Sequence, residues 1–255
     1  MHRSSNDRQH FIRVGVLIII STILMTWMLK LALPLPTKAS AQAFTVDRVL
    51  DVHIVLISFF FSLVVVFMLY SLVVFRRRAG DTSEGEHFEG NTALEIVWTV
   101  VPLIVVLFLG YLGVRTLNTI VAPQPDEITV DVKGFQWAWT FDYPEGGFTS
   151  PELVLPVNQP AVMEMTATDV LHSFWVPEFR VKQDLVPGQT THVRFTPVEV
   201  GEYKLRCAEL CGLTHWNMLA TVRVVPQDEY DAWMTEQAAK ADTAVAGVVD
   251  EHVSD

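Results

Sequence analysis

Two long runs of uncharged residues constrain this chain more than any other feature of its sequence. Ile54–Phe75 contains 22 residues without a charge, and Ile96–Val114 contains 19. Each run is long enough to cross the hydrocarbon core of a membrane as an α-helix. Pro102, near the start of the second run, is tolerated where neighbouring helices satisfy the carbonyl that it frees. We therefore predict a transmembrane α-helical hairpin over residues 42–120.

The loop between the two runs sets the orientation of the hairpin. It is short and polar, and it opens with Arg76, Arg77 and Arg78. Because basic loops stay on the cytoplasmic side, both outer flanks of the hairpin are predicted to lie outside the cell, as is everything after Arg115. The expected location is the plasma membrane of a prokaryote, crossed more than once.

Residues 1–41 hold a third apolar run, Val14–Leu29, which is shorter and ends at Lys30. A basic leader precedes it, with Arg3, Arg8 and Arg13. The small residues Ala39-Ser40-Ala41 have the pattern of a signal-peptidase site. The segment is therefore either a signal peptide or an extra N-terminal membrane helix, and the leader, the short run and the site together favour cleavage. Both readings predict the same orientation for the rest of the chain.

Residues 121–240 are predicted to fold as a water-soluble β domain outside the membrane. Short runs rich in β-formers alternate with Pro and Gly, which is typical of an antiparallel sandwich or barrel. The expected strands are Glu127–Lys133, Gln136–Phe141, Ala161–Thr166, His192–Phe195, Glu202–Leu205 and Ala220–Val225. A short helix is expected over Asp228–Lys240, and residues 241–255 are predicted to form an acidic mobile tail.

The charge of the chain is unevenly distributed. Residues 125–255 contain 8 Lys and Arg against 21 Asp and Glu, a net charge of −13, whereas the other residues carry +2. So acidic a surface attracts basic protein partners and repels nucleic acid. We therefore expect no nucleic-acid partner.

One short segment carries the candidate chemistry. The two cysteines of the chain, Cys207 and Cys211, are followed by His215 and Met218. A thiolate, an imidazole and a thioether at loop spacing suit copper far better than magnesium or calcium. Mononuclear blue-copper sites also need a second histidine, and His172 is the natural candidate.

Two thiolates, two imidazoles and one thioether are more ligands than one copper ion needs. Two copper ions bridged by both sulfurs would use all of them, with Met218 and the carbonyl of Glu209 as weak axial donors. No position is left open for a substrate, so electron transfer is the function that such a centre suits. Structural zinc would leave Met218 unused, and a disulfide across so short a loop would add little stability.

Four motifs resemble those of cytochrome c oxidase subunit II. They are Cys207-x₃-Cys211-x₃-His215-x₂-Met218, Asp169-Val-Leu-His172-Ser173, Gly134-Phe-Gln136-Trp137-Ala-Trp139 and Leu94-Glu95-Ile-Val-Trp98. The resemblance extends from about residue 47 to residue 233. It implies an all-β, cupredoxin-like Greek-key sandwich after the membrane hairpin, with His172, Cys207, Glu209, Cys211, His215 and Met218 as ligands of a binuclear copper A centre.

The same resemblance implies roles beyond the copper ligands. Trp137 is similar to the tryptophan at which electrons from cytochrome c enter, whereas Trp139 is expected to pack in the core. Glu95 is similar to a carboxylate at the inner mouth of a proton pathway, although the helix dipole alone would also favour an acidic residue there. The side chain of Glu209 would face a magnesium ion shared with subunit I.

The partners implied are oxidase subunit I, which carries haem and a haem–copper site, subunit III, and cytochrome c as donor. No Cys-x-x-Cys-His motif occurs, so the donor is expected to be a separate protein. All copper ligands are present, which argues against a quinol donor. Two rival functions stay open. One is the copper A subunit of a nitric oxide reductase, and the other is a membrane-tethered copper-delivery protein.

Overall fold

The computed structural model describes residues 5–82, 84, 87 and 89–253. The chain forms two compact units. Residues 1–35 and 47–114 make up a helical unit, and residues 36–46 and 115–255 make up a β unit. The β unit therefore includes residues 36–46, which lie on both sides of the predicted boundary at residue 41, and residues 115–120, which we had assigned to the hairpin.

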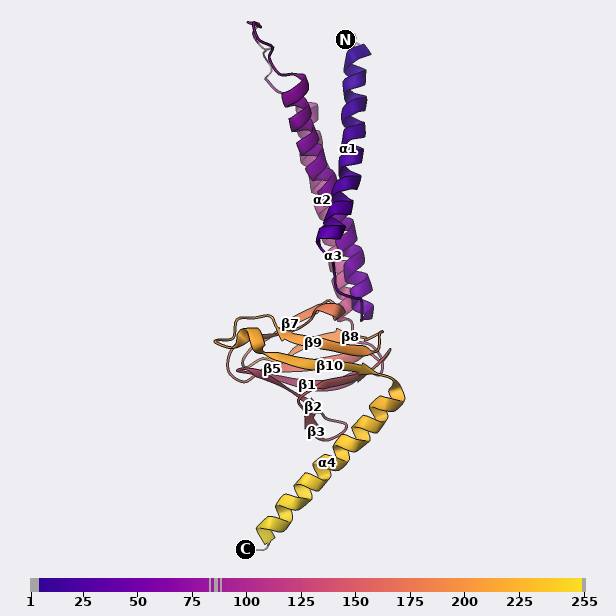
Figure 1. Cartoon of the computed structure of the whole chain (residues 1–255), viewed down its shortest axis with the longest axis vertical. Coiled ribbons are helices and arrows are strands. Elements are labelled where there is room, and N and C mark those ends of the chain that lie inside the picture. Colours follow the sequence, from indigo (N-terminus) through magenta and orange to yellow (C-terminus); the bar gives the residue numbers. More distant parts are fainter. Residues whose placement is uncertain (1–4, 83, 85–86, 88, 254–255) are drawn as a thin grey trace. The chain divides into compact units, whose positions relative to one another are not determined.

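The helical unit is built from α1 (Ser5–Ala32) and most of α2 (Ala41–Val74) and α3 (Thr92–Val121), drawn from indigo to magenta in Figure 1. Among the described residues, these three helices are long and apolar enough to span a membrane. The two uncharged runs lie inside α2 and α3, as predicted, except that Phe75 follows the end of α2. The first span, over residues 7–32, is longer than the apolar run read from the sequence.

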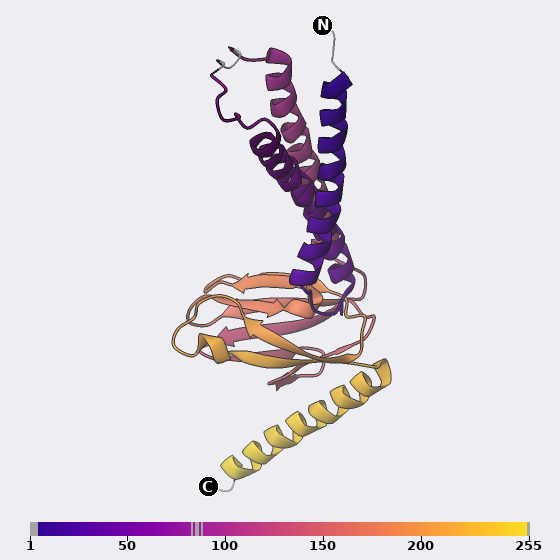
Figure 2. The same cartoon turned by 45° about the horizontal axis from the view of Figure 1, so that its top comes forward.

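Polar contacts join α1 to α2 near both ends of α1. His10 and Tyr70 share a hydrogen bond of 2.6 Å between Nδ1 and Oη. The ammonium of Lys30 donates to Asp51 Oδ1 at 2.8 Å. These pairs fix the antiparallel register of the two helices (Figure 2).

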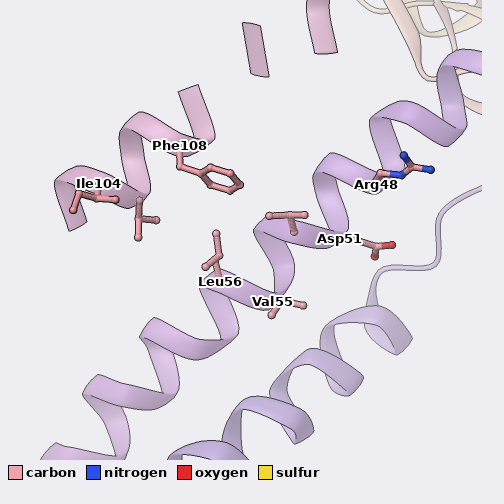
Figure 3. A pocket seen from close by; sticks show the side chains of 8 residues that line it. Arg48, Asp51, Val55, Leu56, Ile104 and Phe108 are labelled. Atoms are coloured by element: carbon pink, nitrogen blue, oxygen red, sulfur yellow. The ribbon is translucent and has the colours of Figure 1, made fainter. Parts of the chain in front are cut away.

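A groove of about 560 Å³ lies between α2 and α3. Figure 3 shows Leu56 of α2 facing Ile104 and Phe108 of α3 across it. Arg48 and Asp51 lie at the end of the groove nearest the start of α2. The apolar lining suits the hydrocarbon environment predicted for these helices.

The β unit is a sandwich of two five-stranded sheets. The first sheet has the order β3-β2-β1-β5-β8, and its strands are β1 (Ile128–Phe135), β2 (Ala138–Tyr143), β3 (Phe148–Ser150), β5 (Ala161–Ala167) and β8 (Thr191–Phe195). The second has the order β4-β10-β9-β6-β7, and its strands are β4 (Leu153–Pro156), β6 (His172–Val176), β7 (Val181–Leu185), β9 (Gly201–Cys207) and β10 (Leu219–Val225). The short 3₁₀ helix η1 (Pro177–Phe179) joins β6 to β7.

The predicted sandwich is confirmed, but its pairing is mixed. The neighbours β1 and β5 run parallel, as do β4 and β10, and the other paired strands are antiparallel. Strands that are distant in sequence thereby become neighbours, as a Greek-key connection requires. The core between the sheets includes the fully buried rings of Phe141, Phe174, Phe179 and Phe195.

Four strands were missed in the sequence, namely β3, β4, β6 and β7. β4 is buried at all four residues, so it has no alternation to detect. The prediction that a strand covers residues 136–141 is wrong at its start, because Gln136 and Trp137 form the turn between β1 and β2.

The helix predicted after β10 is longer than expected. α4 covers Gln227–Val253, so the structure extends it through most of the segment predicted as a tail. Its first turns bury Trp233 against the rings of Tyr143 and Phe148, and Tyr230 packs against Trp233. Figure 2 shows α4, in yellow, leaving the sandwich where β10 ends.

Candidate metal centre

The β9 strand and the loop after it position five of the six predicted ligands. Side chains alternate along a strand, so Leu205 and Cys207 both point into the sandwich while Arg206 points out. The chain then turns, His215 begins the 3₁₀ helix η2 (His215–Asn217), and Met218 directly precedes β10. The amide of Cys207 donates to the carbonyl of Met218 at 3.1 Å, which closes the loop at its base.

The structure brings the six predicted ligands together. Four of these side chains are buried, with exposed fractions of 0% for His172 and Met218, 8% for Cys207 and 2% for Cys211. The distances are 3.8 Å between the two Sγ atoms, 3.9 Å from Cys207 Sγ to His172 Nδ1, 3.5 Å from Cys211 Sγ to His215 Nδ1, 3.7 Å from Cys211 Sγ to Met218 Sδ and 3.3 Å from Cys207 Sγ to Glu209 O.

The two cysteines are free thiols. Their sulfurs are 3.8 Å apart, far beyond the roughly 2.0 Å of a disulfide bond. Burial and the adjacent Cys207 raise the pKa of Cys211 to about 12. Thiols in such a setting keep their protons until a bound cation replaces them, so metal binding releases protons.

Asp169 orients the imidazole of His172. Its Oδ1 lies 2.8 Å from His172 Nε2, which leaves Nδ1 directed at Cys207. Burial would raise the pKa of Asp169, but hydrogen bonds from His172 and from the amides of Gln136 and Val170 outweigh it and lower the pKa. A carboxylate behind a ligating histidine fixes the tautomer and orientation of the ring. The sequence analysis quoted Asp169 in a motif but assigned it no role.

Two glycines make room for these groups. A Cβ on Gly134 would lie 3.4 Å from His172 Cδ2 and 3.3 Å from Trp139 Cζ3. Gly212 has φ +116°, and a Cβ there would lie 2.8 Å from Gln136 Nε2. Side chains at both positions would therefore displace residues around the centre. In the sequence, Gly134 opens one of the four motifs but was given no role, and Gly212 was not singled out.

The turn between β1 and β2 lies against the ligand loop. Gln136 Nε2 donates to the carbonyl of Cys211 at 2.8 Å, and Trp137 Nε1 donates to the same oxygen at 3.2 Å. Trp137 is 38% exposed, so its ring connects solvent with a candidate ligand. Trp139 is 4% exposed and packs edge-on against His172, as expected of a core residue.

The rim of the ligand loop is apolar. Leu210, Leu213 and Trp216 have exposed fractions of 77%, 86% and 77%. Large exposed apolar side chains that cluster on one loop mark a protein contact surface. The centre therefore lies beneath a surface suited to a partner.

Glu95 is the one predicted functional side chain outside the β unit. It lies in the first turn of α3, where its amide donates to the carbonyl of Asn91 at 2.9 Å. Its side chain is exposed. It belongs to the helical unit, whereas the other predicted site residues belong to the β unit.

The donor set fits copper. Two thiolates, two imidazoles and a thioether are soft and borderline ligands, and the oxygen ligands that magnesium or calcium would need are limited to one carbonyl. His172, Cys207 and Cys211 place one ligand atom each within 4.8 Å of one another, close enough for shared coordination. A single tetrahedral zinc ion would not use Met218, although its sulfur lies 3.7 Å from Cys211 Sγ.

Comparison with known families decides which proteins this chain is related to. Residues 26–115 match the transmembrane domain of cytochrome C oxidase subunit II, and residues 148–225 match the periplasmic domain of the same subunit. The chain belongs to the cytochrome c oxidase subunit II family. The expected cupredoxin-like fold and the resemblance read from the motifs are thereby confirmed.

Two relatives agree with this assignment, and one solved structure is reported beside them. The chain is 32% identical to cytochrome c oxidase subunit 2 of Synechocystis over 251 residues, which covers 80% of this chain and 76% of that protein. It is 33% identical to the same subunit of Thermostichus vulcanus over 273 residues, covering 86% of this chain and 83% of that one. The solved periplasmic domain of subunit II from Bradyrhizobium japonicum is 31% identical, with a TM-score of 0.44, and the match covers 46% of this chain and 97% of that structure.

Membership in the subunit II family has three direct consequences. The chain is a subunit of a membrane oxidoreductase, the family implies a copper A centre, and subunit II functions in a complex with other oxidase subunits. Within the β unit, residues 148–225 match the periplasmic domain of the family. With the membrane-length helices, this locates the protein in a prokaryotic plasma membrane.

Proposed function

We propose that this chain receives electrons from cytochrome c at a binuclear copper A centre and delivers them to haem in subunit I. Oxygen is reduced to water there, with coupled proton translocation. The observation that carries the proposal is the convergence of Cys207, Cys211, His172, His215 and Met218, with the carbonyl of Glu209, in one buried cluster. No ligand in this set is left idle if two copper ions share both sulfurs.

When bound, the copper pair supplies a centre that takes up and releases one electron at a time. The protein contributes rigidity to that chemistry. Asp169 is hydrogen-bonded to the imidazole of His172. The amide of Cys207 donates a hydrogen bond to the carbonyl of Met218 at the other end of the ligand loop. Because the surrounding strands are fixed by the sandwich, the ligands move little when the charge changes, which favours fast electron transfer.

Trp137 is the proposed point of electron input. Its partly exposed ring can meet a donor, and its N–H donates to the carbonyl of Cys211. A single hydrogen bond therefore connects the ring to the backbone of a copper ligand. The exposed Leu213 and Trp216 on the adjacent loop supply apolar contact area for a docked protein.

The charge of the outer domain favours cytochrome c as the donor. A net charge of −13 over residues 125–255 attracts a basic protein over distances longer than direct contact. Electrostatic attraction raises the rate of encounter and orients the partner.

Glu95 is proposed to take up protons for subunit I. It lies at the start of α3, on the side that the arginine triplet assigns to the cytoplasm. Ionisable groups at the ends of membrane helices mark proton paths. A magnesium ion at the Glu209 side chain and an association with subunit III rest on the family resemblance alone.

Copper stoichiometry and electron paramagnetic resonance of the purified complex test the proposal. We expect two copper ions in this subunit and hyperfine structure from one electron shared by two copper nuclei. One copper ion with mononuclear splitting, or rapid exchange of copper with a chelator, would favour a delivery protein. Oxygen consumption with reduced cytochrome c, compared with nitric oxide consumption, identifies the catalytic partner.

A further inference from the structure

The connection between α1 and α2 belongs to the β unit, which is the predicted outer domain. We call residues 36–43 the strap. It contains Ala39-Ser40-Ala41, the motif that resembles a signal-peptidase site. Ala39, Ser40 and Ala43 have exposed fractions of 0%, although linkers between membrane spans usually lie on the surface. The second half of the strap is therefore packed against the domain, with Ala41 as its exposed residue.

Main-chain hydrogen bonds attach the strap to two parts of the β unit. Ser40 forms a bridge with Pro197, between β8 and β9. The bonds on either side of it are Ala39 N to Glu178 O at 3.0 Å, Val198 N to Ala39 O at 2.9 Å and Ala41 N to Thr196 O at 3.0 Å. The strap thus pairs with the domain through an isolated β-bridge at Ser40.

Side chains of the strap itself reinforce this attachment. Ser40 Oγ donates to the carbonyl of Phe179 at 2.8 Å and accepts from the amide of Ala43 at 3.1 Å. Gln42 Oε1 accepts from the amide of Thr196 at 3.0 Å. The strap is therefore held by side chains of its own as well as by its backbone.

Arg180 holds the start of the strap. Its guanidinium donates to the carbonyls of Pro36 at 2.7 Å and Thr37 at 3.3 Å, and also to Pro177 at 2.7 Å. Its backbone has φ +56°, so it adopts the left-handed conformation where η1 ends. The bonds to Pro36 and Thr37 extend the attachment to the residues just after α1.

The strap also supports the copper centre. Its partners Glu178 and Phe179 belong to η1, which connects β6 with β7. The β6 strand begins at His172, and that residue pairs with Leu185 of β7. The strap therefore stabilises the β6–β7 hairpin, whose first residue is the candidate copper ligand His172.

Cleavage after Ala41 would damage this arrangement. It would remove Ala39 and Ser40, and so would leave the carbonyls of Glu178 and Phe179 and the amide of Val198 without these partners. It would also create a charged ammonium on Gln42, a residue that is only 6% exposed. Unpaired buried polar groups and buried charges are both unfavourable.

The α1 helix has contacts of its own within the helical unit. Lys30 pairs with Asp51, and His10 bonds Tyr70, so both ends of α1 are matched to α2. Val14 and Ile18 are nearly buried, at 7% and 8%. A signal peptide destined for removal needs no such partners. The family match to the transmembrane domain also begins at residue 26, inside α1 and ahead of the motif.

We propose that the bond between Ala41 and Gln42 stays intact, and that the working subunit keeps α1 as a third membrane-spanning helix joined to the outer domain by the strap. The inference is independent of the metal chemistry, because it concerns the covalent chain.

Mass spectrometry of the subunit, purified with its complex from native membranes, tests this directly. We expect the mature chain to retain α1 and the strap, so its mass should exceed that of a chain that begins at Gln42. Trypsin should release the peptides Leu31–Lys38 and Ala39–Arg48, the second of which spans the bond in question. A chain whose first residue is Gln42, or any residue beyond Ala32, would overturn the proposal.

Two matched variants separate processing from packing. Ala41→Leu places a large residue where a signal peptidase needs a small one, but Ala41 is exposed, so the fold accommodates it. We expect its mass to differ from wild type by the substitution alone, with an unchanged copper signal. Ala39→Leu puts the same bulk into a fully buried position and should lower the copper content and stability of the domain. An Ala41→Leu chain that is longer than the wild-type chain would show that the wild-type chain is cleaved.

Discussion

The indole N–H of Trp137 donates to the carbonyl oxygen of Cys211 at 3.2 Å. This one bond connects a partly exposed aromatic ring to a residue of the proposed copper centre. The two residues are distant in sequence, and they meet because the β1–β2 turn lies against the loop after β9. Several expected outcomes depend on this and similar contacts.

Replacing Trp137 with Phe tests the electron path. The variant keeps an aromatic ring but loses the N–H, so turnover with cytochrome c should fall by about tenfold or more while the copper spectrum stays unchanged. Stopped-flow reduction of the copper centre measures the step. Trp139→Phe is the control, since Trp139 is buried beside His172 and its loss should alter stability and copper binding instead. Equal reduction rates in wild type and Trp137→Phe would remove Trp137 from the path.

Asp169→Asn tests the orientation of His172. The variant keeps the size of the side chain but loses its charge and the defined acceptor for Nε2, so copper affinity should fall by roughly 10- to 100-fold. Competition with a copper chelator measures the affinity. Glu202→Gln, which removes one negative charge from an outward-facing position on β9, should leave the affinity unchanged. A similar loss in both variants would point to overall charge rather than orientation.

Gly212→Ala tests the close approach of the β1–β2 turn. Its φ of +116° and the 2.8 Å approach to Gln136 mean that a methyl group forces both backbone strain and displacement of the Gln136 amide. The free energy of unfolding should fall by about 1–3 kcal/mol, together with a loss of copper affinity. Urea denaturation followed by tryptophan fluorescence measures the first quantity.

The matched control for that variant is Gly147→Ala. Gly147 also has positive φ, +65°, but a Cβ there meets no atom within 4 Å. Backbone strain alone should lower the free energy of unfolding of this variant, by roughly 1–2 kcal/mol, and its copper affinity should not change. If the two variants bind copper equally well, the contact at Gly212 does not support the centre.

Glu95→Gln tests proton uptake. The substitution keeps the shape of the side chain and removes its ability to carry a proton, so steady-state oxygen consumption should slow while copper content stays the same. Glu89→Gln, in the polar segment before α3, is the control and should behave like wild type. Unchanged turnover in Glu95→Gln would exclude this residue from the mechanism.

Salt dependence tests the acidic surface. With cytochrome c as donor, kcat/KM should fall by at least about tenfold as the ionic strength rises from roughly 0.01 M to roughly 0.5 M, because added ions screen the attraction to the acidic domain. A small uncharged reductant should show no comparable loss. A flat response with cytochrome c would mean that apolar contacts alone govern docking.

Much of this protein could be predicted from the sequence because the relevant signals are local. The membrane spans are continuous apolar runs, and the arginine triplet that orients them is adjacent. Five candidate ligands lie within twelve residues, so the ligand types can be recognised before the fold is known. The short strands were only partly found, since β4 is buried at every residue and lacks the alternation that marks a half-buried strand.

Tertiary structure alone decided the contacts between distant segments. Register and sheet order placed Asp169 behind His172, and Gln136 and Trp137 over Cys211. They also buried Ala39 and Ser40, which in the sequence resemble an exposed cleavage motif. The physical reason is that hydropathy and ligand type belong to each residue, whereas burial and hydrogen-bond pairing depend on which remote strands become neighbours.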